Sequence, residues 1–288
     1  GKCVVSIQGE DVLSCRVTVE NSITVTIPPK SGLRILHNGV EAAYRMNPLK
    51  KGHLLAIDIG TTSVVCFLLD GRTGQELASA SALNVQAAFG ADVISRIQAA
   101  LAGDLEQERD AIRNELAELI LSVCRTADVA PGDIGVVSVV GNPAMQQLFM
   151  GISPKNLASV PFAPVLTEAA TMPCADILPI CKNAKLLVVP NISGYIGGDT
   201  MGCVLSTGMY AAEPLTLMVD IGTNGEMVLG NREHMIACST AAGPALEGAS
   251  ILFGMRGAEG AIDHVWMENG RLCCSVIGGG AAQGICGS

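Results

Sequence analysis

The segment Val219–Glu226, with the sequence VDIGTNGE, predicts how this 288-residue chain folds. Apolar residues lead into Asp220, a glycine-rich turn follows, and a second apolar segment begins at Met227. This pattern is typical of a tight β-hairpin whose turn leaves backbone N–H groups and hydroxyls open to a phosphate. An aspartate at the strand end is suited to hold a hydrated Mg²⁺ beside that phosphate. The turn residues expected to bind phosphate are Gly222, Thr223, Asn224 and Gly225.

A second hairpin of the same kind is predicted 162 positions earlier in the chain. Asp58 stands near the end of an apolar segment, a Gly-Thr-Thr turn follows, and Val64–Leu69 continues as a strand. The residues expected to bind phosphate here are Gly60, Thr61 and Thr62. Two copies of Asp-Ile-Gly-Thr, each between strands, favour a duplicated lobe that binds one nucleotide between two hairpins. The alternative is that both segments are ordinary hairpin turns.

This duplication resembles the superfamily of acetate and sugar kinases, heat-shock chaperones and actin. The resemblance implies an α/β fold with two ribonuclease-H-like lobes, the first over residues 53–213 and the second, incomplete, over 214–288. It also implies that ATP is the ligand and that Asp58 and Asp220 hold Mg²⁺ through water. In a Gly-Asp-Thr segment, Asp199 resembles the aspartate that serves as base in the hexokinases. The alternative is that Asp199 only caps a helix.

The remaining pattern of apolar residues predicts strands and helices around the two hairpins. The first three strands are expected to form an antiparallel meander, and Asp92 is expected to cap the first helix. The expected strands span residues 54–59, 64–69, 76–82, 134–140 and 186–190, the expected helices span 93–102, 105–125, 144–150 and 198–209, and a last hairpin spans 262–277.

Composition excludes several classes of protein. The net charge is −9 and Lys and Arg form no cluster, which argues against nucleic acid or an anionic membrane as partner. No apolar segment reaches the 18 or so residues of a membrane span, and no leader opens the chain, so we expect a cytoplasmic protein. Eleven cysteines, an odd number, do not form the disulfide framework of a secreted domain.

Residues 1–29 resemble the C-terminal part of a plant-type [2Fe–2S] ferredoxin domain, and residues 30–52 are expected to be a linker. In that domain three cysteines cluster on one loop and the fourth comes from a later strand. The resemblance implies that Cys3 is the last loop ligand and Cys15 the distant fourth, with the first two upstream of Gly1. The alternative is a pair of half-buried thiols.

Several further segments resemble one family, the reductive activators of corrinoid proteins, and together they cover essentially the whole chain. In the last of them, Gly243, Pro244 and Glu247 are candidates for a nucleotide-binding loop. The family pattern also continues beyond Ser288, so we expect this chain to be an internal fragment that alone holds no cluster and binds ATP weakly. The segments are 84–86, 89–97, 141–145, 161–165 and 239–248.

The family implies an ATP-hydrolysing electron-transfer activase. A [2Fe–2S] cluster would take one electron from a low-potential donor and pass it to a Co(II) corrinoid protein of a methyltransferase or O-demethylase system, which regenerates Co(I). Such an electron transfer is uphill, and each ~59 mV against a one-electron transfer costs about 1.4 kcal/mol. ATP binding and hydrolysis between the lobes would drive it.

Three alternatives stay open at this point. Activators of 2-hydroxyacyl-CoA dehydratases are also electron-transfer ATPases, but they carry a [4Fe–4S] cluster at a dimer interface and need no ferredoxin domain. A chaperone-like or actin-like protein would use nucleotide to switch partners without electron transfer, and a small-molecule kinase would phosphorylate an acceptor. The oligomeric state stays open too, with a homodimer among the alternatives.

Overall fold

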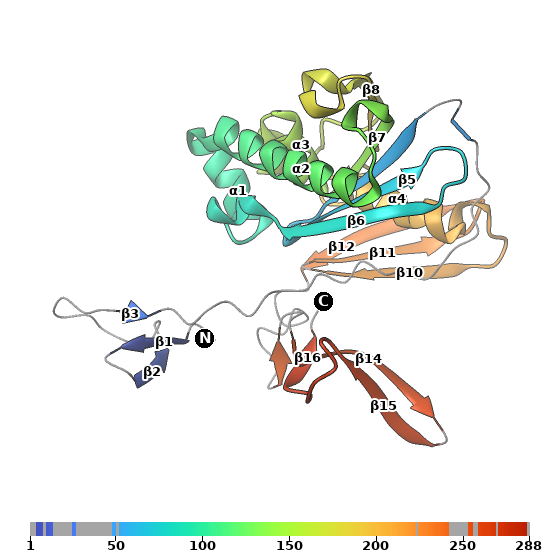
Figure 1. Cartoon of the computed structure of the whole chain (residues 1–288). Coiled ribbons are helices and arrows are strands. Elements are labelled where there is room, and N and C mark those ends of the chain that lie inside the picture. The colour runs from blue at the N-terminus through green and yellow to red at the C-terminus, as the bar shows by residue number, and fades with distance from the viewer. Residues whose placement is uncertain are drawn as a thin grey trace. The chain divides into compact units, whose positions relative to one another are not determined.

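A computed structural model shows that the chain forms two compact units (Figure 1). The larger unit comprises His37–Asp220 and Gly225–Thr240, and the smaller comprises Gly1–Leu36, Ile221–Asn224 and Ala241–Ser288. The residues that the structure describes are 4–7, 10–13, 25–26, 48–49, 52–222, 224–241, 253–255, 259–268 and 270–286.

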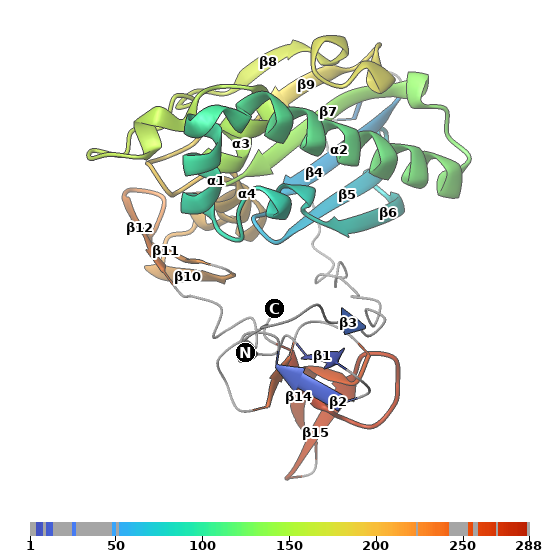
Figure 2. The same ribbon diagram turned by 90° about the vertical axis from the view of Figure 1, so that its left-hand side faces the viewer.

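A six-stranded mixed sheet, in the order β6-β5-β4-β7-β9-β8, organises the larger unit (Figure 2). Strands β4, β5 and β6 pair antiparallel, which confirms the predicted meander. Strand β7 runs parallel to β4, β9 runs parallel to β7, and β8 is antiparallel to β9. The bounds are β4 His53–Ile59, β5 Ser63–Asp70, β6 Glu76–Leu83, β7 Ile134–Gly141, β8 Ala170–Pro173 and β9 Lys185–Val188.

The core of the larger unit lies on one face of this sheet. Successive side chains of a strand point to opposite faces. Leu55 and Ile57 of β4 therefore share the buried core with Val137 and Val139 of β7. Asp58, between the buried positions of β4, lies on the other face and is exposed to solvent.

Helix α2 (Leu105–Ala127) covers this core with the apolar face that the sequence predicts (Figure 1). Helix α1 (Val93–Ala99) is shorter than the predicted 93–102, because Ala100–Asp104 form a π-helical turn in which Gly103 has φ 125°. Residues of L chirality rarely adopt such a φ, so the regular helix ends before it. The buried residues of the α2 face are Ile112, Leu116, Leu119, Ile120 and Val123.

Helix α4 (Gly198–Thr207) lies on the face of the sheet opposite to α2, since its Gly202 adjoins the side chain of Val140. A three-stranded sheet follows in the order β10-β11-β12, with bounds Thr216–Ile221, Asn224–Gly230 and Met235–Ala241. The other helical segments are η2 Val85–Ala88, η4 Pro131–Asp133, α3 Pro143–Met150, η5 Pro154–Leu157, η6 Cys174–Asp176, η7 Pro179–Cys181 and η8 Met209–Ala211.

The described residues of the smaller unit form two sheets. Strands β1 (Val4–Ile7), β2 (Glu10–Leu13) and β3 (Val25–Thr26) form an antiparallel sheet in the order β2-β1-β3. The other sheet has the order β13-β16-β14-β15 and contains the last predicted hairpin as β14 and β15. Its bounds are β13 Gly254–Met255, β14 Ala261–Glu268, β15 Arg271–Val276 and β16 Gly284–Cys286.

The described strands of residues 1–29 leave the ferredoxin-like assignment a prediction, because Cys3 and Cys15 lie outside the described residues. None of the helices in the described part of the chain is long and apolar enough to cross a membrane.

Candidate active site

The site is built where strands β4 and β7 end and helix α4 begins. Asp58 is the penultimate residue of β4, and the Gly60–Thr62 turn follows it. Gly197, which precedes α4, lies so close to the end of β7 that a Cβ on it would clash with the carbonyl oxygen of Gly141. Only glycine permits this approach, which places Asp199 of α4 beside the carboxyl ends of the strands. In α/β proteins this edge of the sheet is the usual place for a ligand.

Three predicted carboxylates, those of Asp58, Asp199 and Asp220, come together in this site, and the pKa values of Asp58 and Asp199 are raised there. Partial desolvation of the Asp58 carboxyl, followed by the negative charges of Asp199 and Asp220, raises its pKa to about 7. Desolvation and the charge of Asp220 also raise the pKa of Asp199, although the N–H of Thr200 donates to its carboxylate at 2.7 Å. The cluster therefore favours a positively charged ligand.

Two further residues of the cluster were missed by the sequence reasoning. Glu226 on β11 accepts a hydrogen bond from the Ser239 hydroxyl at 3.0 Å, and desolvation followed by nearby carboxylates raises its pKa to about 7 against that bond. The Cys203 thiol lies 3.8 Å from the Asp220 carboxylate, and desolvation together with the surrounding acids raises its pKa to about 12. The sequence offered a signal for each residue. Glu226 ends the VDIGTNGE segment, and Cys203 follows Asp199 by four residues, which places both on one face of a helix.

The donor set suits a hard cation held through water. Carboxylate oxygens are the ligands that Mg²⁺ prefers, and Mg²⁺ usually keeps several of its waters. Within the described residues, no group of three or more His, Cys, Asp and Glu side chains is arranged to hold a metal ion directly. The residues present therefore fit a hydrated Mg²⁺ shared with a phosphate better than a fully protein-coordinated metal.

Asn84 and Asn142 hold the first hairpin through hydrogen bonds to its turn. The side-chain amide of Asn84 donates to the carbonyl of Gly60 at 2.8 Å, and its backbone N–H donates to the carbonyl of Thr62 at 2.9 Å. Asn142, which caps helix α3, donates to the Thr61 hydroxyl oxygen at 3.0 Å. A Cβ on Gly60 would lie 2.7 Å from the carbonyl oxygen of Ser63, so the turn requires glycine there. The carbonyl groups of the turn are thus fixed toward the protein.

The second hairpin is described in part. The N–H of Gly222 donates to the carbonyl of Asn224 at 2.9 Å, and Gly225 is buried on β11. That the two hairpins bind one nucleotide between them stays a prediction. The predicted site residues outside the described part of the chain are Cys3, Cys15, Thr223, Gly243, Pro244 and Glu247.

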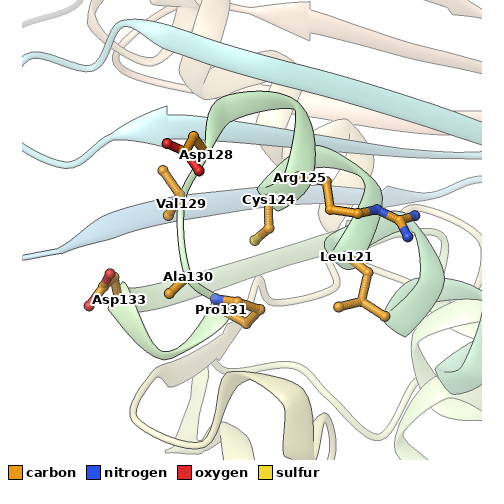
Figure 3. Close-up of a pocket in the computed structure, with 8 residues that line it drawn as sticks. All are labelled: Leu121, Cys124, Arg125, Asp128, Val129, Ala130, Pro131 and Asp133. Atoms are coloured by element: carbon orange, nitrogen blue, oxygen red, sulfur yellow. The ribbon is translucent and has the colours of Figure 1, made fainter.

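A surface depression of about 450 Å³ lies at the carboxyl end of α2 (Figure 3). Cys124, Arg125, Asp128 and Asp133 are among the residues that line it, and none of the predicted site residues does. It adjoins the start of strand β7, whereas the carboxylates lie where β4 and β7 end. This depression is therefore separate from the candidate site.

Comparison with known proteins gives consistent results. Residues 54–212 match the family described as the RACo middle region, and residues 214–288 match the C-terminal domain of RACo, the ASKHA domain. The chain is 44% identical over 237 residues to the corrinoid activation enzyme RamQ of Eubacterium limosum, covering 81% of this chain and 40% of RamQ.

Two more relatives have related names. The [Co(II) methylated amine-specific corrinoid protein] reductase of Methanosarcina barkeri is 27% identical over 224 residues, which cover 74% of this chain and 41% of that protein. A solved reductive activator for corrinoid, iron-sulfur protein matches with a TM-score of 0.72 and 39% identity over 83% of this chain and 39% of its own. The chain thus spans about two fifths of the length of these relatives.

Proposed function

Because the chain belongs to the RACo family of reductive activators of corrinoid proteins, we propose that it serves the ATP-dependent reduction of a Co(II) corrinoid protein to Co(I). The proposal assigns the nucleotide to two lobes, residues 53–213 and 214–288, with the carboxylate cluster as the hydrolytic site. The names of the curated relatives, a corrinoid activation enzyme and a Co(II) corrinoid protein reductase, support this assignment.

The observation that carries the proposal is the meeting of Asp58, Asp199 and Asp220 beside a glycine hairpin. These residues come from three different elements, and the repulsion between their charges is a cost that a bound cation would relieve. A cluster with no ligand to bind would gain nothing from this repulsion. Phosphoryl chemistry requires this combination of donors for phosphate oxygens and carboxylates around a cation.

Each residue then has a defined role. The turn residues Gly60–Thr62, with Gly222–Gly225 of the second hairpin, bind the β- and γ-phosphates through N–H groups and hydroxyls. Asp58 and Asp220 would hold a hydrated Mg²⁺, which would supply positive charge next to the phosphate oxygens. Asp199 orients the attacking water and accepts its proton, as a positioned base does.

The proposal assigns electron transfer to the N-terminal part of the chain. Cys3 and Cys15 would be two ligands of a [2Fe–2S] cluster, a group that would supply one-electron transfer between a low-potential donor and the corrinoid. Closure of the lobes on ATP would favour a complex in which this uphill transfer proceeds, since a ligand shifts an equilibrium by its differential affinity for the two states.

Phosphate release from ATP tests the proposal in the natural protein that carries this chain. We expect hydrolysis to require Mg²⁺ and to accelerate when a corrinoid protein in the Co(II) state is added. Absence of both nucleotide binding and hydrolysis, with the corrinoid protein present, would overturn the assignment of the carboxylate cluster.

A further inference from the structure

Arg96 of helix α1 is a cation inside the core of the larger unit, with only 1% of its surface exposed. Arginine is rarely buried unless its N–H groups are paired. Its Nη2 donates to the carbonyl of Thr61 at 2.7 Å, its Nε donates to the carbonyl of Gly90 at 2.9 Å, and its Nη1 lies 3.2 Å from the sulfur of Met145. Arg96 therefore joins helix α1 to the middle of the first glycine hairpin.

Glu108 of helix α2 supplies a negative charge to the same region. Its side chain is fully buried, and neither carboxylate oxygen has a hydrogen-bond partner within the described part of the chain. Burial raises its pKa to about 7, against the opposing field of Arg96. Burial lowers the pKa of Arg96 to about 10, so the guanidinium remains charged at neutral pH. The arginine is thus a permanent cation with a buried acid near it.

The bond to Thr61 has a direct consequence for the hairpin. The C=O and N–H of one peptide unit point in nearly opposite directions, so fixing the Thr61 carbonyl inward also fixes the direction of the Thr62 N–H. A hydrogen bond from a charged donor is about twice as strong as a neutral one and polarises the peptide unit that accepts it. Arg96 therefore acts on the turn that the proposed function assigns to the phosphates, although it touches no phosphate itself.

We propose that Arg96 is a positioning residue that holds the Gly60–Thr62 turn in its phosphate-binding conformation. The identity of the ligand rests on the proposed function, whereas the effect on the turn does not. A purely structural role, in which Arg96 only attaches α1 to the core, would predict lower overall stability with no selective change in the turn.

Two substitutions separate these roles. Arg96→Met keeps most of the buried length and removes every hydrogen bond, while Arg96→Lys keeps the charge near Glu108 and loses the planar fork. The matched control is Arg113→Met, because Arg113 of α2 also donates from Nε to a carbonyl, that of Phe149 at 2.9 Å, away from the hairpin.

The measurement is hydrogen–deuterium exchange of the peptide covering residues 57–66 in the natural protein without nucleotide, followed by titration with Mg·ATP. We expect Arg96→Met to accelerate exchange in this peptide by about 10-fold or more and Arg96→Lys to give an intermediate increase, by loss of a charged hydrogen bond. Both substitutions should also weaken Mg·ATP binding, Arg96→Met more than Arg96→Lys. Arg113→Met should leave exchange in this peptide at the parent rate.

Parent-like exchange in residues 57–66 of either folded Arg96 variant would overturn the proposal. If Arg96→Met does not fold, the lysine variant decides by the same criterion. If the parent protein fails to bind Mg·ATP while the Arg96 variants still accelerate exchange, the proposed function fails and the positioning role of Arg96 stands.

Discussion

The side-chain nitrogen of Asn142 lies 3.0 Å from the hydroxyl oxygen of Thr61. This hydrogen bond joins the end of strand β7 to the first glycine hairpin. The orientation of the amide is fixed, because its oxygen accepts a hydrogen bond from the N–H of Met145 at 3.1 Å. The Thr61 hydroxyl accepts from Asn142, so its own proton remains to donate to another group. Asn142 thus has two roles: it caps α3, and it orients the Thr61 hydroxyl, which we propose to bind the phosphate.

Substitution of Asn142 should separate these two roles. Asn142→Ala should cost about 1 kcal/mol through the lost cap and should also weaken Mg·ATP binding. Asn142→Ser retains a capping oxygen but cannot donate to Thr61 as the amide does. We therefore expect near-parent stability and binding as weak as that of the alanine variant, measured by thermal melting and calorimetric titration. A serine variant with parent affinity would show that the bond to Thr61 is dispensable.

Asp58→Asn should stabilise the chain in a pH-dependent way. The pKa of Asp58 is about 7 in the folded chain against its usual 3.8. Between these values the folded state holds a proton that the unfolded state has lost, so stability falls as pH rises through this window and stays low above it. Without divalent cations, the asparagine variant should melt a few degrees above the parent at pH 8 and close to it at pH 4.

The control for this comparison is Glu118→Gln, a charge removal on the exposed face of α2. It should shift the melting temperature at pH 8 by much less than Asp58→Asn does. An advantage of Asp58→Asn that does not grow between pH 4 and pH 8 would contradict the strained carboxylate cluster.

The two turn glycines should respond differently to alanine. A Cβ at Gly60 would meet the Ser63 carbonyl at 2.7 Å, whereas at Gly222 the nearest atom is the Asn224 oxygen at 3.7 Å. We expect Gly60→Ala to destabilise the protein by about 1–3 kcal/mol. Gly222→Ala should change stability by less than ~0.5 kcal/mol and still weaken Mg·ATP binding by about 10-fold, because the methyl group occupies space at the phosphate. Unchanged ATP affinity in Gly222→Ala would make the second hairpin a structural turn.

Asp199 and Asp220 should lose different functions on substitution. Asp199→Asn should leave Mg·ATP affinity within a few-fold and lower the rate of hydrolysis by about 10²–10⁴-fold, the range for loss of a positioned base. Asp220→Asn should instead weaken Mg·ATP binding. Binding is measured by titration and hydrolysis by phosphate release. Parent-rate hydrolysis by the Asp199 variant would show that this residue is not the base.

Local patterns were sufficient to predict most of the strands and helices of the larger unit, but not the short edge strand β8. The β4 to β6 meander follows from alternating apolar residues, and the buried face of α2 follows from the 3.6-residue period. A further exception is the end of α1, where the π-helical turn depends on how Gly103 connects two helices. A lone glycine in a helical pattern gives only a weak local signal for such a turn.

The surroundings of the site could be predicted only in part. Asp58 and Asp220 stand in sequences whose local chemistry already indicates phosphate binding. Arg96 instead has the sequence context of an ordinary helical residue, and its burial against the hairpin depends on how α1 packs. Glu226 and Cys203 join the cluster because β11 and α4 approach the same carboxylates, which is tertiary information.

The most direct test of the account is the oxidation state of the cobalt in a corrinoid protein. The natural protein, a low-potential reductant and a corrinoid protein poised as Co(II) are mixed without oxygen, and the visible spectrum is followed before and after addition of Mg·ATP. We expect Co(I) to accumulate only after Mg·ATP is added and hardly at all with the Asp199→Asn variant. Equal formation of Co(I) without nucleotide, or with that variant, would contradict it.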